Sequence, residues 1–183
     1  MLNRLFNRFK RSILLALFAA GLAFTYLTLV PDSLNAQSSA AEVVRHPIPN
    51  STFPIALAVE TPATATTVYV SGQVPPLVNA DADKNSVEAY GDTQTQTVNV
   101  LKRIQDILTS LDLTMADVVK MQVFLVADPA TSKMDFEGFM AGYTQFFGTP
   151  EQPNLPARSA MEVAALVNPG WLVEIEVVAL RMP

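Results

Sequence analysis

Two amphipathic helices are predicted by apolar residues that recur at intervals of three and four positions. The first covers residues 93–110, where the apolar face lies opposite Lys102, Arg103 and Asp106. The second covers residues 134–147 and carries aromatic side chains at helical spacing, which we expect in the core. The apolar face of the first helix consists of Val98, Leu101, Ile104, Ile107, Leu108 and Leu111.

Strands are predicted by short apolar, β-branched and alternating runs around these helices. Residues 118–127 are almost continuously apolar, which is typical of a strand covered on both faces. Residues 74–90 contain prolines and an Asp/Asn-rich centre and predict a long surface loop or lid. The other predicted strands are residues 53–59, 66–71, 156–166 and 173–176. The resulting order β-β-α-β-α-β-β predicts an α+β fold with two helices packed on one face of a mixed sheet.

The first 36 residues have the pattern of a targeting segment. Four basic residues precede residues 13–30, which contain no charge, and Leu34-Asn-Ala36 forms a small-residue cleavage site. The apolar run is intermediate in length between a signal peptide and a membrane span, so both remain open, as does a buried helix of the domain. We expect residues 1–36 to be a signal peptide or an N-terminal membrane anchor, 37–52 a linker and 53–183 the folded domain. Both main alternatives predict a protein that is periplasmic or exported, or anchored to the inner membrane.

Composition narrows the possible chemistry. The chain has no cysteine, which excludes disulfides, a thiolate nucleophile and zinc–thiolate sites, and its one histidine, His46, excludes a multi-histidine metal site. It also lacks glycine-rich phosphate-binding motifs, so we expect neither a metal nor a nucleotide cofactor. Eight basic and sixteen acidic residues follow position 36 and give a net charge of −8. An acidic domain without a basic stripe is not expected to bind nucleic acid.

The two C-terminal strands carry the most informative polar residues. Arg158 stands at the start of a β-like apolar segment, where an unpaired guanidinium would be costly to bury. Glu174 and Glu176 alternate with apolar residues, so both carboxylates are predicted on one face of the last strand. We expect the two strands to adjoin and to bring a cation beside a carboxylate, which suits a site that holds a small carboxylate and moves a proton. An ordinary Arg–Glu pair at a strand edge is the alternative.

Short motifs along the domain match those of one family. The most specific are Pro156-Ala-Arg-Ser159 and the following Val173-Glu-Ile-Glu176. The others are Ser71-Gly-Gln73, the helix around Leu101 and Leu108, Asp117-Val-Val-Lys120, Val123-Phe-Leu125, Tyr143-x-x-Phe-Phe147 and Glu162-Val-Ala164. Together they resemble the YjgF/RidA family of reactive-intermediate deaminases, and the resemblance covers residues 53–181.

This resemblance implies a chorismate-mutase-like fold and a homotrimer with three clefts between subunits. It also implies hydrolysis of 2-imino acids and their enamine tautomers to 2-oxo acids and ammonia, without a metal or organic cofactor. In that chemistry, Arg158 would bind the substrate carboxylate, and Glu174 would orient the attacking water and act as the acid/base group. Ser71 and Gly72 would line the pocket, whereas Glu176 is expected to be a structural partner or a surface charge.

Two positions depart from the family pattern. The family has a tyrosine in the first strand, where this chain has Phe53-Pro-Ile-Ala56, and an asparagine where this chain has Met140. We therefore expect Met140 to line a pocket of altered, more apolar specificity. Three hypotheses remain open. The first is an imine deaminase, and the second is a module that binds a small carboxylate-bearing metabolite through Arg158 without turnover. The third is the endoribonuclease activity attributed to some family members, which the net charge disfavours.

Overall fold

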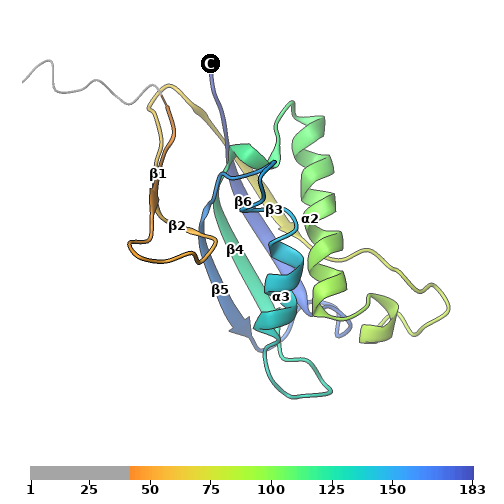
Figure 1. Cartoon of the computed structure of the whole chain (residues 1–183). Helices are drawn as coiled ribbons and strands as arrows, with labels where there is room; N and C mark the ends of the chain where they lie inside the picture. The colour runs from red at the N-terminus through yellow and green to blue at the C-terminus, as the bar shows by residue number, and fades with distance from the viewer. Residues whose placement is uncertain (1–41) are drawn as a thin grey trace, which may run out of the picture. The chain divides into compact units, whose positions relative to one another are not determined.

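The computed structural model describes residues 42–183 of the chain. The signal peptide or membrane anchor predicted for residues 1–36 lies outside the described residues. In the part of the chain that is described, no helix is long and apolar enough to cross a membrane. This part consists of one six-stranded mixed sheet with two α-helices, so the predicted α+β class is confirmed (Figure 1).

The sheet is built around a long central strand. Its members are β1 (Val44–Pro47), β2 (Ala56–Glu60), β3 (Thr66–Gln73), β4 (Val118–Val126), β5 (Ala157–Val163) and β6 (Val173–Arg181), in the spatial order β1-β2-β5-β4-β6-β3. β4 pairs in parallel with β5 and antiparallel with β6, which pairs antiparallel with β3. β2 joins β5 through one parallel pair only, Ala56 with Ala157. The β1–β2 hairpin is therefore attached to the sheet at one end of β5.

The first predicted helix is confirmed and the second is shorter than predicted. Helix α2 spans Thr93–Ser110, and the side chain of its N-cap residue Asp92 accepts a hydrogen bond from the Thr95 amide. Helix α3 spans Phe136–Tyr143 instead of residues 134–147. It begins after Asp135, whose carboxylate accepts a hydrogen bond from the Gly138 amide. After α3 the chain continues as turns, because an apolar period alone does not fix where a helix ends.

Both helices pack on the same side of the sheet, which we call the helix face; the other side is the open face (Figure 1). Side chains alternate between these faces along each strand. Val123, Ile175 and Val177 are fully or almost fully buried on the helix face. They pack there with the apolar side of α2 and with the aromatic side chains of α3, which confirms that the aromatic stripe belongs to the core.

The segment predicted as a linker, residues 37–52, instead contributes β1, so three strands rather than two precede α2. Arg45 holds this strand in place across a long sequence separation. Its guanidinium donates hydrogen bonds to three backbone carbonyls, at 3.2 Å to Leu155, 2.9 Å to Ala116 and 3.0 Å to Val118. These bonds tie β1 to the segments that lead into β4 and β5.

The long loop predicted for residues 74–90 is present and has a fixed C-terminal end. It contains one 3-10 turn, η2 (Val87–Ala89), after which the hydroxyl of Tyr90 donates to the Lys84 carbonyl at 3.0 Å. The buried Gln96 amide donates to the carbonyls of Gly91 and Gly170 at 2.8 and 3.0 Å. The lid role suggested for this loop stays a prediction.

Candidate functional site

Arg158 lies on the helix face, inside a group of aromatic rings. It pairs in register with Met121 of β4, which pairs with Val177 of β6, and both of these partners are buried in the core. The guanidinium carbon lies over four rings, at distances to the ring centroids of 4.2 Å for Tyr143, 4.9 Å for Phe139, 5.5 Å for Phe53 and 6.0 Å for Phe136. Cation–π attraction to these rings offsets part of the free energy lost when the cation leaves water.

The guanidinium lacks a carboxylate partner within residues 42–183, where the one ion pair is His46 with Glu60. Its Nη2 atom lies 3.3 Å from the sulfur of Met140, and its Nη1 atom is buried without a hydrogen-bond partner among the described residues. Burial lowers the pKa of Arg158 and Tyr143 opposes this shift, but an arginine remains cationic at neutral pH. A partly buried cation with a buried, unused donor can bind a carboxylate.

The ring of Tyr143 packs against the Arg158 guanidinium. Its hydroxyl donates a hydrogen bond of 2.9 Å to the Pro54 carbonyl, which lies next to Phe53. Burial raises the pKa of Tyr143 to about 12, although the positive charge of Arg158 acts in the opposite direction. The phenol is therefore neutral at physiological pH and holds the segment that carries Phe53 against Arg158.

A cavity of about 290 Å³ gives access to Arg158 from the β1–β2 hairpin. One side consists of residues from β4 and β5, including Arg158 and Ser159. The hairpin side is apolar and consists of Ile48, Ile55, Ala56 and Leu57. A ligand bound to Arg158 here would have apolar side chains beside it.

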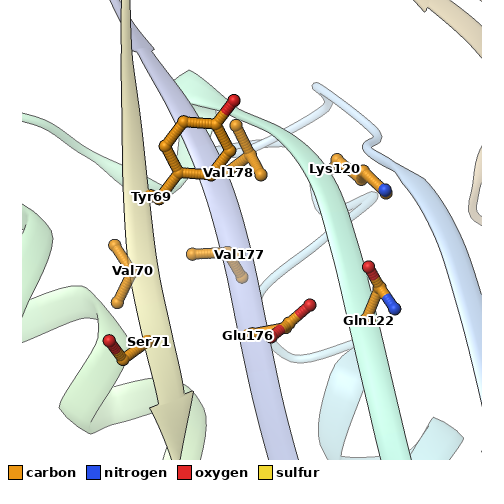
Figure 2. Close-up of a pocket in the computed structure, with 8 residues that line it drawn as sticks. All are labelled: Tyr69, Val70, Ser71, Lys120, Gln122, Glu176, Val177 and Val178. Carbon is orange, nitrogen blue, oxygen red and sulfur yellow. The ribbon is translucent and has the colours of Figure 1, made fainter.

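The two carboxylates of β6 lie on one face of the strand, as predicted, and this is the open face of the sheet. Glu174 pairs with Phe124 and Glu176 pairs with Gln122, whereas the intervening Ile175 is buried on the helix face. A second cavity, of about 260 Å³, is hollowed in the open face, and Figure 2 shows the Glu176 carboxylate directed toward Gln122 there. Its lining residues are Tyr69, Val70, Ser71, Lys120, Gln122, Glu176, Val177 and Val178.

Ser71 and Gly72 form a β-bulge beside the two glutamates. Between the pairs Val70–Val177 and Gln73–Ile175, β3 has two residues where β6 has one. Ser71 lines the open-face cavity, and Gly72 lies against the side chain of Glu174. The structure thus places Ser71, Gly72 and Glu174 together, as a group separate from Arg158 and Met140.

The expected meeting of Arg158 and Glu174 does not occur within one chain. β5 and β6 do not adjoin, because β4 lies between them. Glu174 is also three positions from Val177, the residue in register with Arg158, so the two side chains are on opposite faces. Two strand spacings and three residues separate their Cα atoms by roughly 14 Å. The register of distant strands, which a sequence does not reveal, is the reason for this difference.

The sequence did not identify the aromatic residues around Arg158 as part of the site. Phe136, Phe139 and Tyr143 were expected only in the core, yet their helical spacing places them on one side of α3, where a buried cation can pack. Lys120, Gln122 and Tyr69 of the open-face cavity were missed as well. In the described range 42–183, no group of three or more His, Cys, Asp or Glu side chains is arranged to hold a metal ion.

Comparisons with known proteins agree on one family. A family model described as endoribonuclease L-PSP matches residues 38–181. A RutC family protein from Haemophilus influenzae is 35% identical over 114 residues, which cover 62% of this chain and 78% of that protein. A 2-iminobutanoate/2-iminopropanoate deaminase from Rattus norvegicus is 30% identical over 146 residues, which cover 78% of this chain and 95% of the relative. The crystal structure of a Rid family protein from Yersinia pestis is similar with a TM-score of 0.54 and 28% identity, covering 75% of this chain and 98% of that one.

Proposed function

Because the chain belongs to the YjgF/RidA family, whose model is described as endoribonuclease L-PSP, we propose that it hydrolyses 2-imino acids to 2-oxo acids and ammonia. The similarity to a 2-iminobutanoate/2-iminopropanoate deaminase supports this reaction. The observation that carries the proposal is the partly buried Arg158 guanidinium, which has a buried, unused Nη1 donor and no carboxylate beside it within the described residues.

Arg158 binds the substrate carboxylate in this proposal. Its planar fork donates two parallel hydrogen bonds, and the aromatic rings around it exclude water and strengthen the pairing. The same pairing gives the buried cation the partner that the free chain lacks. Binding therefore orients the imine carbon relative to the protein.

Glu174 activates the attacking water in this proposal. As a carboxylate it accepts a proton from the water that attacks the imine carbon, which forms a C–O bond and turns the C=N double bond into a single bond. The proton then moves to the nitrogen and gives a carbinolamine. The carboxylate next transfers the hydroxyl proton to the nitrogen as well, the C–N bond breaks and ammonia leaves, while the oxygen forms the carbonyl of the 2-oxo acid. One water is consumed for each ammonia released, and neither a redox partner nor a cofactor is needed.

The active site in this proposal lies between two copies of the chain, because one copy holds Arg158 and Glu174 on opposite faces of its sheet. Arg158 from one copy meets Glu174, Ser71 and Gly72 from the next. A closed homotrimer provides three such sites and also covers the open face, where the Tyr69 side chain is 80% exposed.

The substrate side chain is apolar in this proposal. Met140, which contacts the guanidinium through its sulfur, supplies no strong hydrogen bond to a ligand. The hairpin side of the Arg158 cavity, with Ile55 and Leu57, is apolar as well. Imino acids derived from leucine-like amino acids fit these surroundings better than the smallest ones.

A second candidate function is binding of a small carboxylate without turnover. The contact between Arg158 and the Met140 sulfur favours it, since an apolar group occupies a position where the family has a polar one. Nuclease activity is not proposed, despite the name of the family model, because a net charge of −8 beyond residue 36 repels nucleic acid.

Ammonia release from freshly generated 2-imino acids tests the proposal. An amino-acid oxidase generates the imines in the assay, and the rate is compared with spontaneous hydrolysis. The wild type is expected to accelerate release, and Glu174→Gln is expected to lower that acceleration about 100-fold or more while it retains 2-oxo acid binding. Glu151→Gln, a change at an exposed acid, serves as the matched control. Saturable binding of 2-oxo acids by a wild type that releases no extra ammonia would support the binding module instead, and the absence of both would contradict both functions.

A further inference from the structure

The Glu174 carboxylate occupies space that only a glycine at position 72 leaves free. A Cβ atom built on Gly72 would overlap Oε1 of Glu174, and would lie 2.9 Å from its carboxyl carbon and 3.2 Å from its Cγ. Ordinary contacts between carbon atoms are about 3.5–4.0 Å. A side chain at position 72 and the Glu174 carboxylate cannot occupy the same space. Any substitution of Gly72 would therefore displace the carboxylate by roughly 1 Å.

The need for glycine here does not come from its backbone. Among the described residues, the glycines with a positive φ are Gly91 and Gly148, so the backbone at Gly72 is one that other amino acids adopt. The three atoms nearest to a Cβ at position 72 all belong to the side chain of Glu174. This separates Gly72 from glycines that a turn requires.

The β-bulge explains how Gly72 comes to lie beside Glu174. In a regular ladder, Ser71 and Gly72 would point to opposite faces of the sheet. The extra residue of β3 opposite Glu176 interrupts this alternation, so Ser71 lines the open-face cavity and the Cβ position of Gly72 is directed at Glu174 as well. The bulge therefore packs backbone, not a side chain, against the carboxylate.

We propose that Gly72 is a positioning residue for Glu174: its backbone forms the wall that fixes where the carboxylate lies. The catalytic consequence rests on the proposed deaminase function. Catalytic groups must be held within about 0.5 Å of their productive places, and a displacement of about 1 Å lowers rates on the order of 100-fold. Gly72→Ala is expected to lower kcat by about that factor. Affinity for the 2-oxo acid product should change little, because Arg158 of the neighbouring copy supplies it.

The experiment compares crystal structures, melting temperatures and ammonia release for the wild type, Gly72→Ala, Glu174→Asp and the double variant. Thr66→Ala serves as the control, since Thr66 is an exposed residue at the far end of β3, paired with Arg181. In the Gly72→Ala structure we expect the Glu174 carboxylate to be displaced, with kcat reduced and KM nearly unchanged. The shorter aspartate removes the two closest of these contacts and leaves only that at the Cγ position, 3.2 Å from the new methyl group. The double variant should therefore be no slower than Glu174→Asp alone, and it should fold even if Gly72→Ala does not.

Several results would overturn this role of Gly72. In Gly72→Ala, these are a carboxylate that stays in place, or an undiminished kcat although the carboxylate is displaced. In the double variant, it is a loss of kcat that equals the two single losses combined. Failure of both Gly72→Ala and the double variant to fold would overturn it as well. The crystal structures also separate this inference from the proposed reaction. If the wild type releases no ammonia, the deaminase function fails, while a carboxylate displaced in Gly72→Ala but not in Thr66→Ala still supports the positioning.

Discussion

Arg158→Met is expected to weaken carboxylate binding strongly while the fold stays about as stable as in the wild type. The unpartnered donor of the buried guanidinium disfavours folding by about 1–3 kcal/mol, and contacts with four rings return about 0.5–1 kcal/mol each. These effects nearly cancel, so the free energy of unfolding should change by no more than about 1 kcal/mol, or about 4 °C in Tm. A methionine matches the apolar surroundings and the neighbouring Met140.

Binding should respond very differently. Loss of a desolvated charge pair weakens association by about 2–5 kcal/mol, which corresponds to about 30-fold to several-thousand-fold in Kd. Arg158→Lys keeps the charge but lacks the planar fork, so its affinity should fall nearly as far. Arg103→Met, at an exposed position of α2, is the control.

Calorimetric titration with 2-oxo acids and thermal unfolding with and without ligand measure both effects. Unchanged affinity in Arg158→Met would show that the assigned carboxylate site is wrong. A loss of more than about 3 kcal/mol in the free energy of unfolding would mean that the guanidinium is a structural cation rather than a binding group kept at the expense of stability.

Three further predictions concern the surroundings of Arg158 and the N-terminus. Burial raises the pKa of Tyr143 to about 12, so the folded state favours the neutral phenol. The resulting contribution to the free energy of unfolding is complete below pH 10 and is lost as the pH rises toward 12. Between pH 10 and pH 12 the free energy of unfolding should therefore fall by about 2–3 kcal/mol more in the wild type than in Tyr143→Phe. Parallel curves of this free energy against pH would refute the shift. Met140→Asn should move the substrate preference in ammonia release toward small imino acids, and an unchanged preference would exclude Met140 from the pocket. Fractionation and N-terminal sequencing should find the native protein outside the cytoplasm, with a start near Gln37 if the leader is cleaved; cytoplasmic protein that retains Met1 would contradict this.

The elements that the sequence predicted well are those in which the local pattern and the packing agree. The bounds of α2 followed from its apolar period, and in the structure Asp92 caps its first turn; β4 followed from its continuous apolar run. β1 was missed because the four residues Val44–Pro47 show no strand pattern. Its place depends on Arg45, which bonds to carbonyls about 70 and 110 residues away in sequence.

The sequence proposed Arg158 and Glu174 for the candidate site, but it indicated neither their geometry nor the aromatic residues around Arg158. Arg158 and Glu174 were chosen as site residues because of their side-chain chemistry and the motifs in which they lie. The alternation of residues along β6 correctly placed Glu174 and Glu176 on one face of the strand. The position of β4 between β5 and β6 depends on long-range pairing, so the opposite orientation of Arg158 could not be obtained from either strand alone. The packing of Gly72 against Glu174 depends on the bulge in β3, which no pattern in the sequence indicates.

The central claim, that Arg158 and Glu174 act together across two copies of the chain, is tested most directly by mixing inactive variants. Arg158→Met and Glu174→Gln are co-expressed with different tags, and mixed oligomers are isolated through both tags. If each site takes its arginine from one copy and its glutamate from the next, every mixed trimer contains one complete site, which is about one third of the wild-type sites. Ammonia release should then recover to about that fraction, although each variant alone is nearly inactive. Mixed oligomers no more active than the two separate variants would contradict the account.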